Sequence, residues 1–125
     1  MTTQKILVDT DVLIDFLRER ERAKQILEGG MQKGSLHSSV VTLAELLAGM
    51  RPEEKEATEA LVEGLILLPV TETIARRAGA LRRQVGSKKI LLPDCLIAAT
   101  ALEDQCLLMT FNQKDYRFPN LLFYS

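Results

Sequence analysis

The sequence is poor in the residues that build several common kinds of functional site. Its 125 residues include no tryptophan, one histidine and two cysteines, and aromatic residues make up 5% of the chain. Because His37 is alone and Cys95 and Cys106 do not have metal-ligand spacing, we expect no zinc site and interpret the cysteines as reduced core thiols. The aromatic residues cluster towards the C-terminus and offer no evident stacking platform for bases, so no base preference can be predicted.

The chain also lacks a large net charge and a long hydrophobic run. The formal net charge of -1 gives no overall attraction to nucleic acid or to a membrane, so any such attraction needs a local patch. No apolar run approaches the roughly 18 residues of a membrane span. The segment Met1–Lys5 leads into an apolar run without the features of a signal peptide. With 46% hydrophobic and 26% charged residues, we expect a single cytoplasmic domain over residues 1–125.

Short apolar runs alternate with segments of helical periodicity along the whole chain. The run Ile6–Val8 is typical of a strand buried on both faces, and further strands are predicted at 35–40, 65–68, 107–109 and 121–123. Helices are predicted from Asp11 onwards, and then over about 21–32, 42–50, 52–63, 74–85 and 93–103. This alternation predicts an α/β fold with a mostly parallel central sheet of four to five strands and helices on both faces. The strand at 65–68 is expected to be buried.

Acidic residues interrupt this apolar pattern at three places. Asp9 and Asp11 follow directly after the first predicted strand, at the edge where open α/β folds bind ligands. Glu45 lies within an apolar helix and is expected to be partly desolvated. Asp94 heads a helix that is apolar nearly all round, and is expected to point inward. The simpler alternatives are an exposed Glu45 on a narrow polar face and an Asp94 that only complements the helix dipole.

A further polar pair, Asn112 and Asp115, follows the strand predicted at 107–109, although both residue types are also common in ordinary turns. Three or four carboxylates that converge on one sheet edge repel one another, and can all stay ionised only around a cation. An all-oxygen set of ligands selects Mg²⁺ or Mn²⁺. Such an ion suits phosphodiester hydrolysis, because it activates water and neutralises the developing charge.

Four segments together resemble the PIN domain family, and within it the VapC-type toxins of toxin–antitoxin pairs. They are 7–13 (LVDTDVL), 40–49 (VVTLAELLAG), 93–102 (PDCLIAATAL) and 109–116 (MTFNQKDY), in the family's order and spacing over nearly the whole chain. The resemblance implies a metal-dependent endoribonuclease that acts on RNA with Mg²⁺ or Mn²⁺. It also implies a cognate VapB-type antitoxin as partner and a homodimeric assembly.

The resemblance implies roles for individual residues as well. Asp9, Glu45 and Asp94 match the family's three acids, and Asp115 is favoured as the fourth acid, with Asn112 as its polar partner. Asp11 stands where the family usually has asparagine, and is interpreted as a helix cap or as a residue that tightens metal binding. Hydroxyls that can orient these carboxylates, or that only cap helices and fill strands, belong to Thr10, Thr42 and Thr110.

Two further features concern partners. A basic run without any acid lies between Thr73 and Pro93, and comprises Arg76, Arg77, Arg82, Arg83, Lys88 and Lys89. This run either contacts RNA phosphates or forms a solvated face that complements the acidic segment 53–63. From the resemblance, the apolar side chains Val12, Phe16 and Leu17 are expected to form a groove for an antitoxin segment.

Two other functions are consistent with parts of the pattern. Asp9 and Asp11 after a buried strand also resemble the nucleophile and acid/base pair of haloacid dehalogenase-type phosphatases. However, Leu13 stands where that motif has threonine or valine. The second alternative is a PIN-like module that binds its partner without catalysis.

Overall fold

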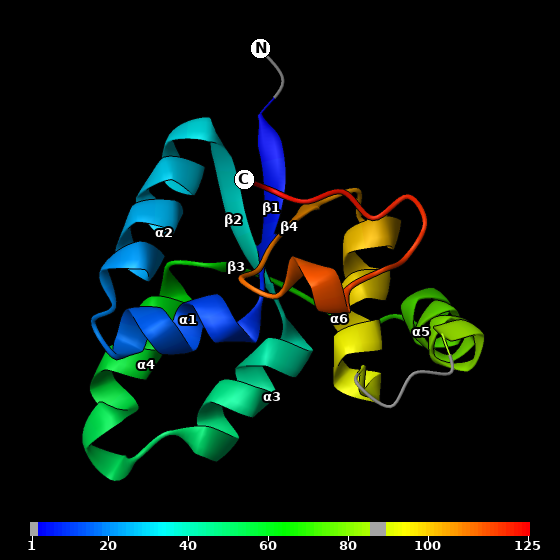
Figure 1. The fold of residues 1–125 in the computed structure, drawn as a ribbon. Helices are drawn as coiled ribbons and strands as arrows, with labels where there is room; N and C mark the ends of the chain where they lie inside the picture. Colours follow the sequence, from blue (N-terminus) through cyan, green and yellow to red (C-terminus); the bar gives the residue numbers. More distant parts are fainter. Residues whose placement is uncertain (1–2, 86–89) are drawn as a thin grey trace.

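A computed structural model describes residues 3–85 and 90–125 of the chain. Four strands form one sheet in the order β3-β2-β1-β4, and every pairing is parallel (Figure 1). The strands are β1 (Gln4–Val8), β2 (Gly34–Ser39), β3 (Ile66–Leu68) and β4 (Leu107–Met109). Because all four strands run in the same direction, their carboxyl ends lie at one edge of the sheet.

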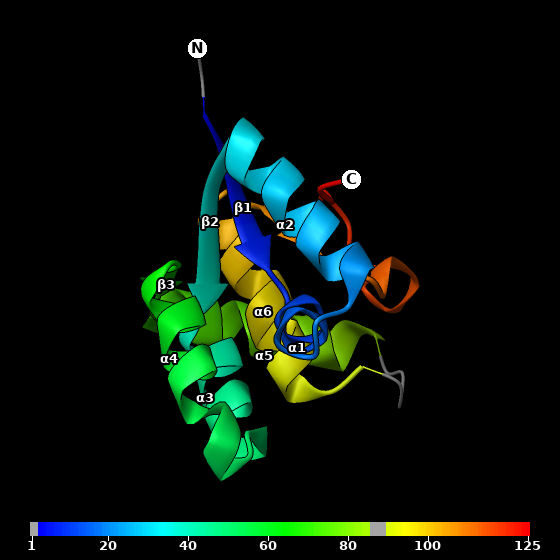
Figure 2. The same cartoon turned by 90° about the vertical axis from the view of Figure 1, so that its left-hand side faces the viewer.

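The central strand β1 places alternate side chains on opposite faces of the sheet. Ile6 and Val8 pack in one apolar cluster with residues of α1 (Thr10–Leu17) and α2 (Glu21–Lys33). Leu7 packs in a second cluster with residues of α5 (Glu72–Val85) and α6 (Leu92–Glu103). Figure 2 looks onto the face that α1 and α2 cover. The strand is therefore buried on both faces, as its unbroken apolar run predicts.

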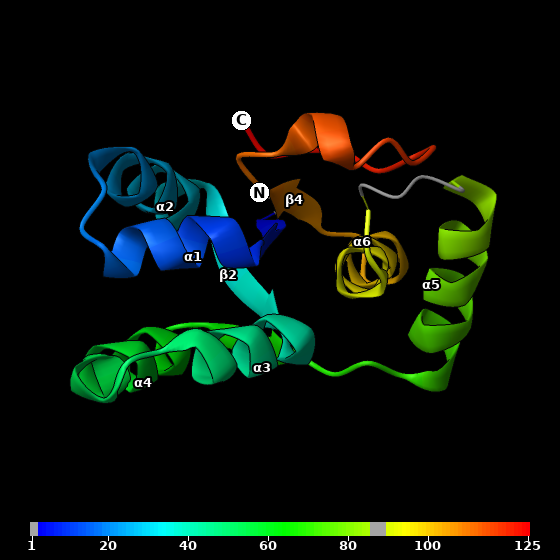
Figure 3. The same cartoon turned by 60° about the horizontal axis from the view of Figure 1, so that its bottom comes forward.

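The remaining helices extend the fold beyond the carboxyl end of β2. Helix α3 (Val40–Gly49) begins directly after this strand, and a short 3-10 helix (Pro52–Glu54) leads into α4 (Lys55–Glu63). Helices α3 and α4 run side by side next to α1 (Figure 3). A second short 3-10 helix (Gln113–Asp115) follows β4. None of the helices in the described segments is both long and apolar enough to cross a membrane.

The predicted burial of the strand at 65–68 is wrong. Ile66 and Leu67 are 52% and 38% exposed, because β3 is a three-residue edge strand that pairs only with β2. An apolar run indicates a strand, but it does not show whether that strand lies in the middle or at the edge of a sheet. The segment 121–123 contributes only an isolated bridge between Leu108 and Phe123.

The two cysteines and the single histidine are buried in the fold, away from any proposed catalytic role. Cys95 and Cys106 are free and buried, as predicted. His37 is buried in β2, and its Nε2 atom lies 2.8 Å from the Ser35 hydroxyl.

Candidate functional site

Asp9 lies at the centre of a group of acids at the carboxyl edge of the sheet. It follows β1, caps α1 and is only 6% exposed. Its Oδ1 atom accepts a hydrogen bond from the Thr10 amide at 2.8 Å. Its Oδ2 atom accepts from the Thr110 hydroxyl at 2.8 Å and from the Tyr116 hydroxyl at 2.9 Å. Asp9 is thus held by donors from both ends of the chain.

Asp94 faces Asp9 across the Tyr116 hydroxyl. It is half-buried in the first turn of α6, and its Oδ1 atom lies 3.3 Å from that hydroxyl. Its Oδ2 atom accepts from the Leu91 amide at 3.3 Å, which satisfies an otherwise unpaired donor at the helix start. The carboxylate therefore caps the helix with one oxygen and faces the other acid with its second oxygen. Tyr116 was not predicted as a site residue; the only sequence signal was its place in the fourth matched segment.

Glu45 joins the group through a second hydroxyl. The Thr10 hydroxyl donates to Glu45 Oε1 at 2.7 Å and lies 3.0 Å from the hydroxyl of buried Thr42. The expectation that Glu45 is partly desolvated is wrong, because the residue is exposed. Helix α3 lies at the margin of the fold, and even its apolar residue Leu47 is 39% exposed.

Asp11 anchors the loop that follows β4. Its Oδ2 atom accepts from the Phe111 amide and the Asn112 side-chain amide, both at 3.1 Å, and lies 3.4 Å from the Thr110 hydroxyl. Its Oδ1 atom is buried without a hydrogen-bond partner among the described residues. Asp115 is exposed in the second 3-10 helix, and no side-chain hydrogen bond joins it to the other acids in the described structure. Asn112 is therefore hydrogen-bonded to the group, and the Asp115 side chain is not.

Burial makes Asp9 and Asp11 difficult to ionise. Burial, and next the charge of Asp11, raise the pKa of Asp9 to about 6, although its three hydrogen bonds act in the opposite direction. Burial also raises the pKa of Asp11. Among the described residues, the ion pairs join Arg22 to Asp15, Arg76 to Glu72, and Arg77 to Glu103. None of these basic side chains neutralises Asp9, Asp11, Glu45 or Asp94.

The candidate metal ligands fit a hard divalent cation. All candidate ligands are oxygens, and Asp11 Oδ1 is a buried acceptor without a partner, which is rare in folded proteins. Within residues 3–85 and 90–125, no three carboxylate, imidazole or thiol groups lie close enough to hold an ion as they stand. Glu45 is exposed, so its carboxylate has room to turn towards an ion that lies beside Asp9 and Asp94.

Part of the predicted basic run is engaged in ion pairs on and beside α5. Arg76 pairs with Glu72 at 2.8 Å and Arg77 with Glu103 at 2.7 Å. Arg82 and Arg83 form no ion pair among the described residues, and Lys88 and Lys89 lie outside them.

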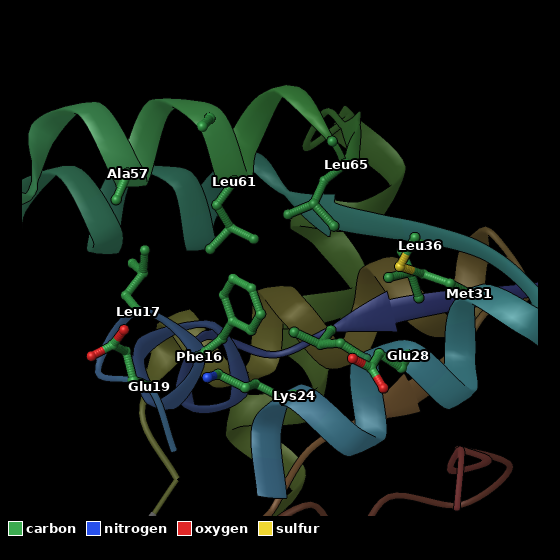
Figure 4. A pocket seen from close by; sticks show the side chains of 13 residues that line it. Phe16, Leu17, Glu19, Lys24, Glu28, Met31, Leu36, Ala57, Leu61 and Leu65 are labelled. Carbon is green, nitrogen blue, oxygen red and sulfur yellow. The ribbon is translucent and has the colours of Figure 1, made fainter. Parts of the chain in front are cut away.

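An apolar groove of about 710 Å³ lies between α1, α2 and α4 (Figure 4). Phe16 and Leu17 line it, as predicted, but Val12 is fully buried in the core and does not. The larger apolar side chains that also line it are Leu27, Met31, Leu36, Leu61 and Leu65. The charged side chains Glu19, Lys24 and Glu28 also border the groove.

Comparisons with known proteins agree with this architecture. The model of the PIN domain matches residues 6–121. Ribonuclease VapC10 of Mycobacterium tuberculosis is 43% identical over 116 residues, covering 91% of this chain and 86% of the relative. Ribonuclease VapC19 of the same organism is 36% identical over 119 residues, covering 92% and 95%.

A solved structure extends the agreement to three dimensions. A toxin–antitoxin complex from Klebsiella pneumoniae contains a chain that superposes with a TM-score of 0.81 at 30% identity, covering 95% of this chain and 96% of that one. Together with the match over residues 6–121 and the relatives above 30% identity, the similarity leads to one conclusion. The chain belongs to the PIN domain family, within its VapC group.

Proposed function

We propose that this protein is an endoribonuclease that hydrolyses RNA phosphodiester bonds with Mg²⁺ or Mn²⁺, and that it is the toxin of a VapBC-type pair. The observation that carries the proposal is a group of carboxylates at the sheet edge that no basic side chain neutralises in the described structure. The two relatives are named ribonucleases, which supports RNA as the substrate class. Membership of the PIN family makes the phosphatase alternative wrong.

The residues that would hold the cation are Asp9, Glu45 and Asp94, with Asp115 as the proposed fourth acid. When bound, the ion would activate a water molecule and neutralise charge that develops on the phosphate. The Thr110 hydroxyl and the Thr10 amide fix the orientation of Asp9, and the Thr10 hydroxyl orients Glu45. Asp11 holds the loop after β4 through Phe111 and Asn112.

The decisive experiment removes one carboxylate without changing side-chain shape. Asp94→Asn should lower cleavage of a structured RNA in Mg²⁺ or Mn²⁺ by at least about 100-fold, above the range typical of residues that only support a ligand. Asp104→Asn is the matched control, because Asp104 caps the opposite end of the same helix. Equal cleavage by the wild type and Asp94→Asn would contradict the site. Cation binding by a wild type that cleaves no RNA would instead favour the non-catalytic binding module.

The same proposal includes a protein partner. The similar structure from Klebsiella pneumoniae is a toxin–antitoxin complex, and another similar structure is that of VapBC-1 from nontypeable Haemophilus influenzae. We propose that a VapB-type antitoxin places an apolar segment in the groove between α1, α2 and α4, where the lining is largely aliphatic and aromatic (Figure 4). Three expectations from the sequence stay predictions: that the protein is a homodimer, that it is cytoplasmic, and that residues 1–125 form a single domain.

A further inference from the structure

Tyr116 connects two of the proposed metal ligands through a single hydroxyl group. The residue follows the second 3-10 helix, is 3% exposed, and packs in the apolar cluster that contains residues of α5 and α6. Its hydroxyl lies 2.9 Å from Asp9 Oδ2 and 3.3 Å from Asp94 Oδ1. The packed ring fixes the hydroxyl between two carboxylates that lie 85 positions apart in the sequence.

The hydroxyl acts there as a donor. A phenol is protonated at neutral pH, and the Tyr116 hydroxyl lies within hydrogen-bond distance of two carboxylate oxygens, which can only accept when ionised. A phenol has one hydrogen, which the two carboxylates must share. A shared donor offsets part of the repulsion between two acids that would otherwise move apart.

The remaining acceptor capacity of both acids leaves room for a cation. A carboxylate offers about four lone-pair sites. Three donors occupy Asp9, namely the Thr10 amide, the Thr110 hydroxyl and the Tyr116 hydroxyl. Asp94 receives the Leu91 amide and the Tyr116 hydroxyl. Each carboxylate is therefore oriented but not saturated.

We propose that Tyr116 is a positioning residue for the metal site: its hydroxyl holds Asp9 and Asp94 in place so that both bind one divalent cation. This inference rests on the proposed function. Hydrogen bonds that orient metal ligands typically contribute 10–100-fold to metal affinity. Folding orders the carboxylates of Asp9 and Asp94 and brings them together before the ion binds. Metal binding therefore does not have to supply that free energy.

The chain contains its own matched control, because it has only two tyrosines. Tyr116→Phe keeps the packed ring and removes only the hydroxyl. Tyr124→Phe makes the same change at a buried tyrosine whose hydroxyl lies beside Gly29 of α2, away from the acids. The dissociation constant for Mn²⁺, measured by electron paramagnetic resonance, should rise about 10-fold or more in Tyr116→Phe and stay unchanged in Tyr124→Phe. Circular dichroism establishes that both variants are folded.

A second measurement leaves both tyrosines in place. Incorporation of 3-fluorotyrosine gives two fluorine resonances, which the two phenylalanine variants assign. Addition of Mg²⁺ should shift the resonance of residue 116 and leave that of residue 124 in place. An unmoved resonance of residue 116 at saturating Mg²⁺, or Mn²⁺ affinity in Tyr116→Phe that equals or exceeds that of the wild type, would overturn the inference.

These binding measurements separate the inference from the proposed function. If Tyr116→Phe weakens Mn²⁺ binding but the wild type cleaves no RNA, the positioning role holds and the ribonuclease proposal fails. If the wild type cleaves RNA and Tyr116→Phe binds Mn²⁺ normally, the ribonuclease proposal holds and the positioning role fails.

Discussion

The acids of this site are joined by hydroxyl groups and one backbone amide rather than by basic side chains. Thr10 donates to Asp9 through its backbone amide and to Glu45 through its hydroxyl. The Thr110 hydroxyl lies between Asp9 and Asp11, and the Tyr116 hydroxyl lies between Asp9 and Asp94. A hydroxyl orients a carboxylate without cancelling its charge, whereas an arginine or lysine would neutralise the acid and compete with a metal ion. This arrangement keeps the sheet edge negative and ordered, which is what a divalent cation needs.

Asp9 makes the metal-free protein sensitive to pH. Because its pKa is raised from 3.8 to about 6, the folded state binds the proton more tightly than the unfolded state does. The stability that this provides is complete below about pH 4 and is lost as pH rises through about 6. In chelator, the free energy of unfolding of Asp9→Asn relative to the wild type should therefore increase by on the order of 2 kcal/mol between pH 4 and 7.5.

Urea unfolding of both proteins at the two pH values measures this difference. A difference between the proteins that does not change with pH would contradict the buried, coupled position of Asp9. Saturating Mg²⁺ at pH 7.5 should stabilise the wild type more than Asp9→Asn, because an ion stabilises only the state that binds it.

At the scale of single elements, helices α3 and α5 each present charged side chains in different settings. Helix α3 has an apolar sequence but stands at the margin, so Glu45 reaches the site from an exposed position. In α5, Arg76 and Arg77 are engaged with Glu72 and Glu103, whereas Arg82 and Arg83 have no ion-pair partner among the described residues. The second pair is therefore the better candidate for a contact with RNA phosphates.

We expect Arg82→Ala/Arg83→Ala to weaken RNA binding and to flatten its salt dependence. For single-stranded RNA, each lost phosphate contact should make the slope of log binding constant against log salt concentration less negative by about 0.7. The control is Arg76→Ala/Arg77→Ala, which removes side chains that already have acidic partners and should change the slope less. Fluorescence anisotropy with a labelled RNA at several salt concentrations measures both. Equal slopes in the two double variants would indicate that α5 presents only a solvated face.

At the scale of the whole molecule, two surfaces with different chemistry are formed by different elements. The acidic edge is built from the ends of β1 and β4 and the starts of α1 and α6, with Glu45 from α3. The apolar groove lies between α1, α2 and α4 (Figure 4). Helix α1 contributes to both, so a partner in the groove would lie close to the site without occupying it.

A charge placed in the groove should separate partner binding from catalysis. Met31 lines the groove and is 67% exposed, so Met31→Glu should leave folding and RNA cleavage intact. Co-purification with a co-expressed VapB-type antitoxin should fall at least about 10-fold, because a buried unpaired charge costs several kcal/mol. Leu122→Glu is the control, since Leu122 is 64% exposed and lies outside the groove. Undiminished co-purification of Met31→Glu would place the antitoxin elsewhere.

The sequence alone determined the order of the elements, the parallel sheet and the positions of Asp9 and Asp94 at a strand end and a helix start. These features depend on local periodicity and on capping, which neighbouring residues encode. The match of Asp9, Glu45 and Asp94 to the family's acids also required no structure. The interpretation of Asp11 as a helix cap is wrong, because Asp9 caps α1 and Asp11 lies in its first turn.

Only the tertiary structure decided which side chains meet and which face solvent. Tyr116 reaches Asp9 across 107 positions of the sequence, and no local pattern indicates that its hydroxyl lies between two acids. The exposure of Glu45 and of β3 depends on their places at the margin of the fold. The structure also joins Asn112 to the acids by a hydrogen bond, whereas Asp115 is exposed. Contacts and burial of this kind arise from the packing of distant elements, which periodicity along the chain does not specify.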